Sequence, residues 1–251
     1  MAASVGVMAR KLRRMTLTPE LVAKVVRVDE SHLPTFTAPS DADHDEAVRA
    51  ILAGAPSADE VWLFAYGSLL WNPACDFVEQ RIGVARGWHR SFCLGWDRWF
   101  RGSDKQPGLM MSLDRGGQCK GSVYRLPPDA VEANLGRLFR RELRAKPSAH
   151  LPRWVNVYTE NGPLRAISFV INRKSGRYVS GLSLEEIADA LAVAVGPWGS
   201  MADYLYNTVR HLEEAGLHDA QLWRLQELVG ERIEATVATP DRHEGGLHGQ
   251  S

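Results

Sequence analysis

The chain has 251 residues, of which 45% are hydrophobic and 24% charged, as in an ordinary globular protein of one domain or at most two. Lysine plus arginine equals aspartate plus glutamate at 30 each, so no overall charge favours a nucleic acid or an anionic membrane as partner. The sequence also contains no run of 18 apolar residues that would span a membrane.

Residues 1–59 are predicted to form an N-terminal helical extension. Thr18 followed by Pro19 is typical of the N-cap and first position of a helix, here a short one over residues 19–26. A second helix is predicted over residues 40–53, because acidic side chains crowd its first turn, where the helix dipole favours them. The extension has the composition of a segment packed on the outside of a core, and nothing in it points to chemistry.

Residues 60–235 are predicted to form the main domain, which begins with short apolar or alternating runs separated by glycine and proline. These runs predict strands, and Gly116-Gly117 predicts a hairpin between the last two. A helix over residues 128–144 follows, and then two strands around the Asn161-Gly162 turn. Strands, helix and strands in this order indicate an α+β fold, with a small mixed or closed sheet flanked by helices. The predicted strands are residues 61–66, 81–85, 88–96, 108–113, 119–126, 153–158 and 164–172.

The last third of the chain is predicted to be helical. Ser183 with Glu186 forms a capping box before an apolar helix that Gly196-Pro197 would stop. Two more helices are expected over residues 201–215 and 219–229. The final residues, 236–251, are rich in glycine and poor in core-forming side chains, so they are predicted to be a disordered tail.

The three cysteines have no spacing typical of a metal site. Cys75, Cys93 and Cys119 form no C-x-x-C pair, which argues against zinc and against a disulfide framework and fits a reducing cytoplasm. Cys93 and Cys119 lie in apolar runs and are interpreted as core residues. Cys75 follows a glycine turn, and a catalytic thiol there is the weaker alternative, since activation of a thiolate needs suitable neighbours.

A glycine turn directly after an apolar strand is the most informative local pattern. Residues 62–65 predict a buried strand, and Gly67 follows it within Tyr66-Gly67-Ser68-Leu69. Successive backbone N–H groups in such a turn can converge on a carboxylate or a phosphate. The alternative is a simple strand and turn with no ligand. Neither a P-loop nor a G-x-G-x-x-G motif is present, so nucleotide hydrolysis and dinucleotide redox chemistry lack their usual phosphate cradles.

Six motifs, in order along the chain, carry a resemblance that this turn alone would not. Together they span residues 61 to about 229, and they closely resemble the signature of the ChaC family of γ-glutamylcyclotransferases. The motifs are FAYGSLLWNP (64–73), RGWHRSFCL (86–94), QPGLM (106–110), GSVYRLP (121–127), REL (141–143) and GPWG (196–199) with YL at 204–205.

The resemblance implies a γ-glutamylcyclotransferase-like fold and cleavage of glutathione to 5-oxoproline and Cys-Gly. In this reaction the α-amine of the γ-glutamyl unit attacks its own γ-amide carbonyl, and no metal or other cofactor is required. One carboxylate reached by both nitrogens can carry the proton between them. The matching Arg-Glu motif assigns that role to Glu142, which by local sequence alone would be a surface ion-pair residue. If apolar neighbours partly desolvate Glu142, its pKa is expected to rise.

The resemblance also suggests substrate-binding residues. Backbone N–H groups of Gly67, Ser68 and Leu69 would bind the α-carboxylate, and Tyr66 would close the pocket. Two further residues are Tyr178, which otherwise is a buried strand-end tyrosine, and Arg101, which could meet the carboxylate of the leaving Cys-Gly. They complete the predicted site, with glutathione as the small-molecule partner.

Two alternatives remain open at this point. The chain could be a cyclotransferase for other γ-glutamyl peptides or amines, because selectivity for Cys-Gly cannot be derived from these residues. It could also be a non-catalytic regulator of cation transport, which would leave Glu142 as a plain surface acid.

Overall fold

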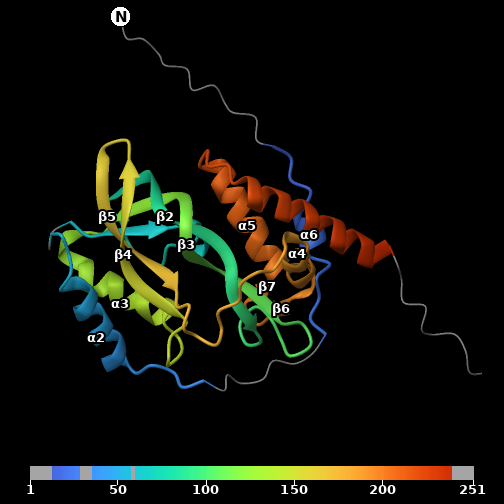
Figure 1. The fold of residues 1–251 in the computed structure, drawn as a ribbon, viewed down its shortest axis with the longest axis horizontal. Helices are drawn as coiled ribbons and strands as arrows, with labels where there is room; N and C mark the ends of the chain where they lie inside the picture. The colour runs from blue at the N-terminus through green and yellow to red at the C-terminus, as the bar shows by residue number, and fades with distance from the viewer. Residues whose placement is uncertain (1–12, 29–35, 58–59, 239–251) are drawn as a thin grey trace, which may run out of the picture.

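The structure is a computed structural model that describes residues 13–28, 36–57 and 60–238. Five strands close into a barrel in the order β1-β3-β2-β4-β5, with β1 paired parallel to β5 and the neighbours along this order antiparallel (Figure 1). The predicted α+β fold with a closed sheet is confirmed. The strands are β1 (Trp62–Ala65), β2 (Glu79–Asp97), β3 (Gly108–Arg125), β4 (His150–Thr159) and β5 (Gly162–Ile171), and a two-stranded ribbon joins β6 (Val195–Gly196) to β7 (Gly199–Ser200).

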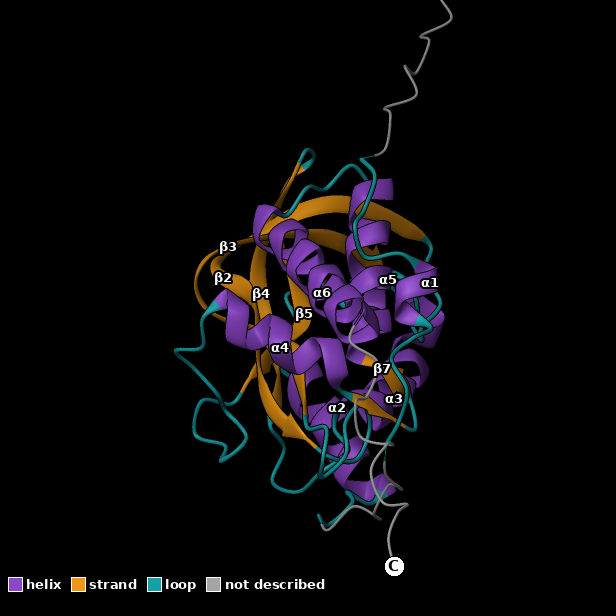
Figure 2. Ribbon diagram, turned by 90° about the vertical axis from the view of Figure 1, so that its right-hand side faces the viewer, coloured by secondary structure: helices purple, strands orange, loops and turns teal. Residues whose placement is uncertain are grey.

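Helices cover the barrel on two sides. Three helices, α4, α5 and α6, form a layer on one side, and α2 packs against α3 on the other (Figures 1 and 2). The helices are α1 (Pro19–Val22), α2 (Asp41–Leu52), α3 (Val131–Glu142), α4 (Leu184–Val193), α5 (Met201–Glu214) and α6 (Ala220–Ala238), with short 3-10 helices η1 (Ser68–Leu70) and η2 (Pro128–Ala130).

The first strand is buried on both faces. Trp62 and Phe64 belong to the core shared with α4, α5 and α6, whereas Leu63 and Ala65 belong to the core shared with α3. All four side chains are at most 2% exposed, as the continuous apolar run predicts for a strand covered on both faces. Strand β1 also pairs on both edges, with β3 and with β5, so the start of the loop that follows it has a fixed position.

The predicted helix caps are confirmed, but the first helix is shorter than expected. Ser183 forms the predicted capping box with Glu186, and the Thr18 hydroxyl accepts a hydrogen bond from the backbone N–H of Leu21. Ser40 forms a further capping box, with Asp43, for which no prediction was made. However, α1 ends at Val22 instead of continuing to residue 26. Val26 is 65% exposed, so no burial there compensates for the low helix propensity of its β-branched side chain.

The predicted hairpin at Gly116-Gly117 is wrong. Both glycines lie inside one continuous strand, β3, which pairs with β2 on both sides of them. Gly116 and Gly117 have φ angles of 105° and 65°. The register between β2 and β3 shifts at this point, so that these two residues of β3 lie opposite the single residue Gly87 of β2. They form a bulge that bends the long β2–β3 ribbon around the barrel. A pair of glycines suits a bulge as well as a turn, and the actual connection between β2 and β3 is residues 98–107.

The N-terminal residues pack directly on the main domain. The ring of Phe36 lies edge-on to Trp99 at 5.4 Å and lies 5.9 Å from Phe100 between centroids. The backbone N–H of Lys146 donates to the Thr37 carbonyl oxygen at 2.8 Å. The extension therefore contacts both the 98–107 loop and the segment after α3, and these two segments border the cavity described next.

Candidate active site

The loop after β1 approaches α5 closely at Gly67. A Cβ atom at this position would lie 2.8 Å from the hydroxyl oxygen of Tyr204, so a larger residue would force one of the two to move. The turn itself is closed by the Leu70 N–H, which donates to the Gly67 carbonyl at 2.9 Å. Just before it, the carbonyl of Tyr66 accepts a hydrogen bond from Nε of the buried Arg90 at 2.7 Å. These contacts fix the position of Ser68.

Glu142 is the last residue of α3. The same helix buries Leu135, Leu138 and Phe139 completely, so its position against the barrel is set by the core. The helix ends where the Leu143 N–H donates to the Phe139 carbonyl. The side chain of Glu142 is 15% exposed and points into a cavity between α3, η1 and α5. A nearly buried carboxylate is therefore presented from a rigid element.

Arg141 connects Glu142 to the loop after β1. Its Nη2 donates to the Ser68 hydroxyl at 2.9 Å, and its Nη1 donates to the carbonyl of Asn72. Its Nε lies 3.3 Å from Oε1 of Glu142. On the opposite side, Nδ1 of His150 lies 3.8 Å from Oε2 of Glu142. Residues far apart in sequence thus meet around one carboxylate.

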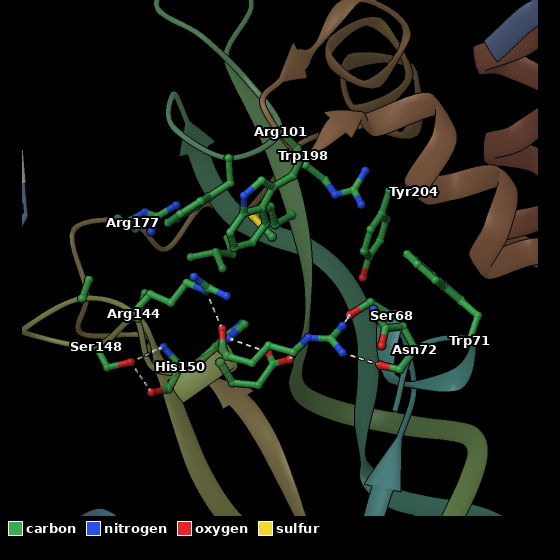
Figure 3. Close-up of a pocket in the computed structure, with 17 residues that line it drawn as sticks. Ser68, Trp71, Asn72, Arg101, Arg144, Ser148, His150, Arg177, Trp198 and Tyr204 are labelled. Carbon is green, nitrogen blue, oxygen red and sulfur yellow. Dashed lines mark hydrogen bonds and ion pairs between the residues drawn. The ribbon is translucent and has the colours of Figure 1, made fainter. Parts of the chain in front are cut away.

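The cavity has a volume of about 380 Å³, within the range of sites for small organic ligands. Ser68, Trp71 and Asn72 lie on one side of it, and Arg144, Arg177 and Trp198 lie on the other (Figure 3). The full lining is Ser68, Trp71, Asn72, Leu94, Phe100, Arg101, Met110, Arg141, Glu142, Arg144, Ala145, Ser148, Ala149, His150, Arg177, Trp198 and Tyr204.

The cavity is strongly cationic, with four arginines around Glu142. Burial raises the pKa of Glu142 above its ordinary value, although Arg141 and Arg144 act in the opposite direction. The sequence-based expectation about this pKa has the correct direction. Burial, reinforced by Arg177, lowers the pKa of His150 to about 4, so the imidazole is neutral at physiological pH. Glu142 is therefore a buried carboxyl group with a raised pKa in a cavity lined by four arginines.

Tyr204 of α5 faces the predicted carboxylate-binding turn. Its hydroxyl oxygen lies 2.8 Å from the position of a Cβ atom at Gly67, and burial raises the pKa of Tyr204 to about 12. The Tyr204 hydroxyl is therefore protonated, and its own hydrogen is available as a donor beside that turn.

Three of the predicted site residues, Ser68, Arg101 and Glu142, line the same cavity. Arg101 donates from Nη1 to the Ser200 carbonyl at 3.0 Å and lies 3.6 Å from the carboxylate of Asp203.

The other predicted site residues do not line the cavity. Gly67 and Leu69 flank Ser68 in the chain, and the side chain of Leu69 is buried in the core beside α3. Tyr66 is buried, and its hydroxyl donates to the Phe169 carbonyl at 2.8 Å. The hydroxyl of Tyr178 donates to Asp114 at 2.9 Å.

Sequence reasoning did not assign roles to Arg141, Arg144, His150, Trp198 and Tyr204, which also line the cavity. Arg141, Trp198 and Tyr204 lie inside the recognised motifs, so the sequence marked their positions but did not show that their side chains line the cavity. His150 and Arg144 lie outside those motifs; Arg144 follows Glu142 by two residues, whereas His150, at the start of β4, is brought to Glu142 by the packing of the chain.

The cysteines are not part of this site. All three are buried and free, and burial raises the pKa of Cys75 to about 11, against use of its thiol as a nucleophile. Among the residues that the structure describes, no group of three or more His, Cys, Asp or Glu side chains could hold a metal ion. None of the described helices has the length and apolarity needed to cross a membrane.

Together, the closed barrel and a buried carboxylate among arginines define a small-molecule site in an α+β domain. Residues 61–232 match the family described as ChaC-like protein, so the chain belongs to the ChaC-like family. The glutathione-specific gamma-glutamylcyclotransferase of Escherichia coli (strain K12) is 38% identical over 174 residues, which cover 69% of this chain and 74% of the relative. Glutathione-specific gamma-glutamylcyclotransferase 1 of Homo sapiens is 30% identical over 184 residues, which cover 70% and 81%.

Solved structures agree with the fold. The crystal structure of a yeast γ-glutamylcyclotransferase specific to glutathione superimposes with a TM-score of 0.62 at 19% identity, covering 69% of this chain and 96% of the yeast chain. A second crystal structure of a yeast γ-glutamylcyclotransferase specific to glutathione gives a TM-score of 0.58. At this identity the likeness concerns the fold, and the predicted γ-glutamylcyclotransferase-like fold is confirmed.

Proposed function

We propose that this protein is a glutathione-specific γ-glutamylcyclotransferase with Glu142 as its general acid and base. The observation that carries the proposal is the nearly buried Glu142 carboxylate, with its raised pKa, in a cavity lined by four arginines. The membership of the chain in the ChaC-like family and the names of its relatives support this reaction.

The reaction is an internal exchange of one amide bond for another. The α-amine nitrogen of the γ-glutamyl unit forms a bond to its γ-carbonyl carbon, and the bond from that carbon to the cysteine nitrogen breaks. The attacking ammonium loses a proton and the departing amine gains one, so the products are 5-oxoproline and Cys-Gly. Glu142 takes the first proton and returns it to the leaving nitrogen. Its raised pKa suits this exchange, since a carboxylate nearer the working pH transfers protons in both directions more readily.

The loop after β1 provides recognition of the γ-glutamyl unit. Backbone N–H groups of Gly67, Ser68 and Leu69 bind the α-carboxylate, with the hydroxyl of Tyr204 as a further donor. The contact of Arg141 with both Ser68 and Glu142 sets the distance between the bound carboxylate and the catalytic one. Folding the γ-glutamyl chain in this way brings amine and carbonyl together, which alone contributes several kcal/mol. Tyr66 supports this wall of the site through the hydrogen bond that its hydroxyl donates to the Phe169 carbonyl, and Arg101 lines the cavity beside the Tyr204 ring.

The proposal includes location and partners. We place the enzyme in the reducing cytoplasm, because its three cysteines are free and buried. Its partner is the small molecule glutathione, and neither a nucleic acid nor a membrane is needed for the chemistry.

The test is product formation by the purified protein. We expect 5-oxoproline and Cys-Gly from glutathione, measured by mass spectrometry, with far less product from γ-glutamyl-alanine. Glu142→Gln should abolish product, whereas Glu132→Gln, at an exposed position of the same helix, should not. Equal turnover of both substrates would instead identify a general γ-glutamyl cyclotransferase. No product from either substrate would refute the enzyme assignment and favour a regulator.

A further inference from the structure

Arg144 is held on an aromatic wall of the cavity. Its guanidinium carbon lies 4.3 Å from the ring centroid of Trp198, and the Trp198 ring packs on Phe100 at 4.4 Å. Phe36 of the N-terminal extension supports Phe100 from behind, at 5.9 Å. A guanidinium stacked on an indole keeps its in-plane N–H groups free to bind a carboxylate. This wall therefore presents a cation in a fixed orientation.

Arg177 lies on the same side of the cavity (Figure 3). Its Nε and Nη2 are buried without a hydrogen-bond partner among the described residues. The nearest acid is Asp97, with Oδ1 at 3.5 Å from Nη2, and the other oxygen of Asp97 already accepts from the backbone N–H groups of Phe100 and Arg101. The buried edge of Arg177 therefore faces Asp97, whose Oδ1 also has no hydrogen bond among the described residues, while Arg177 still lines the cavity.

The other two arginines of the cavity are already occupied. Arg101 is bound to Ser200 and Asp203, and Arg141 to Ser68, Asn72 and Glu142. Arg144, in contrast, has no carboxylate within 4 Å in the described part of the chain, and only its Nε is used, by the Arg141 carbonyl. Among the described residues, Arg144 is thus the cavity arginine without an ion-pair partner, and Arg177, paired with the buried Asp97, lies on the same side of the cavity.

We propose that Arg144 and Arg177 bind the terminal carboxylate of the leaving dipeptide and make the enzyme selective for glutathione. This assignment rests on the proposed function and completes it. Glutathione has two carboxylates, and the loop at Ser68 accounts for the one on the γ-glutamyl unit. The glycine carboxylate lies two residues beyond the scissile nitrogen, within about 7 Å when extended. Ser68 and the Arg144–Arg177 pair face each other across the cavity, as a ligand with a carboxylate at each end requires (Figure 3).

The experiment compares glutathione with its glycine carboxamide, which differs only in the terminal charge. For the unaltered protein we expect kcat/KM to be about 10- to 100-fold higher for glutathione, as is typical of hydrogen bonds to a charged group. Arg144→Gln and Arg177→Gln should each lower kcat/KM for glutathione more than for the amide, so the preference falls toward one; any effect through the nearby Glu142 acts on both substrates alike and cancels in this ratio. Arg153→Gln, an exposed arginine of β4 outside the cavity, is the matched control and should keep the preference.

The outcomes separate the two proposals. If the unaltered protein cleaves both substrates equally well, the carboxylate assignment is wrong while the cyclotransferase activity stands, and this comparison needs no folded variant. Retention of the full preference in both arginine variants, with unchanged circular dichroism, would also overturn it. Failure to cleave either substrate would refute the proposed function, and this assignment with it.

Discussion

Glu142→Gln separates catalysis from stability most clearly. Loss of a general acid and base typically lowers the rate about 100- to 10,000-fold, or about 3 to 5 kcal/mol of transition-state stabilisation. The amide has nearly the same shape, so the substrate should still bind, and the loss should appear in kcat more than in KM.

The same substitution should not destabilise the fold at neutral pH. Two effects compete at Glu142: burial disfavours the ionised carboxylate, and the nearby guanidinium groups of Arg141 and Arg144 favour it. The pKa is raised on balance, so burial is the larger effect. The unfolded chain then loses its proton at lower pH than the folded chain, and this carboxyl lowers stability as pH rises from its unfolded pKa to its folded pKa. A neutral glutamine removes that cost.

The assays are steady-state kinetics and thermal melting across pH 4 to 8. We expect the variant to melt at an equal or higher temperature than the unaltered protein at pH 7, with the difference shrinking toward pH 4. In the unaltered protein kcat/KM should fall at low pH as Glu142 becomes protonated, and the residual activity of the variant should not show this fall. A variant that keeps more than a tenth of the activity, or that melts well below the unaltered protein at pH 7, would refute this reasoning.

Four further predictions concern the site and the core. Gly67→Ala should lower kcat/KM at least tenfold, because the added Cβ would lie 2.8 Å from the Tyr204 hydroxyl; unchanged kinetics would contradict this packing. Tyr204→Phe should raise KM for glutathione about tenfold or more by removing one donor to a charged group, whereas an unaltered KM would remove Tyr204 from the substrate site. Phe139→Ala should lower the free energy of unfolding by about 3 to 5 kcal/mol in urea titrations, since the ring is fully buried against Phe169, and a loss below 1 kcal/mol would argue against that burial. The cysteines should react with Ellman's reagent at pH 8 only after unfolding, because burial raises their thiol pKa values to about 11 or 12, and rapid labelling of the folded protein would refute this; they are Cys75, Cys93 and Cys119.

Some of the residues that line the cavity could be predicted from the sequence. Glu142 and Ser68 were accessible because each lies in a motif with a recognisable pattern, and Arg101 because it precedes such a motif. The aromatic wall was not accessible, since stacking of Arg144 on Trp198 joins a segment after α3 to the ribbon before α5. No local spacing encodes a contact between residues so far apart. The predicted role of Tyr178 came from a loose alignment, and the structure engages its hydroxyl with Asp114 instead of the cavity.

Local patterns determined the fold class, the buried first strand, the capped helices and the family, because each depends on the conformational preferences and burial of neighbouring residues. The continuous apolar run of residues 62–65 sufficed to predict a buried strand, and Ser183 with Glu186 sufficed to predict the start of a helix. Only the tertiary structure decided that Gly116-Gly117 bends a ribbon instead of turning it, and that Arg141 links Ser68 to Glu142. Those outcomes depend on which distant segments share a core, and burial and unpaired charge arise only once the chain has packed.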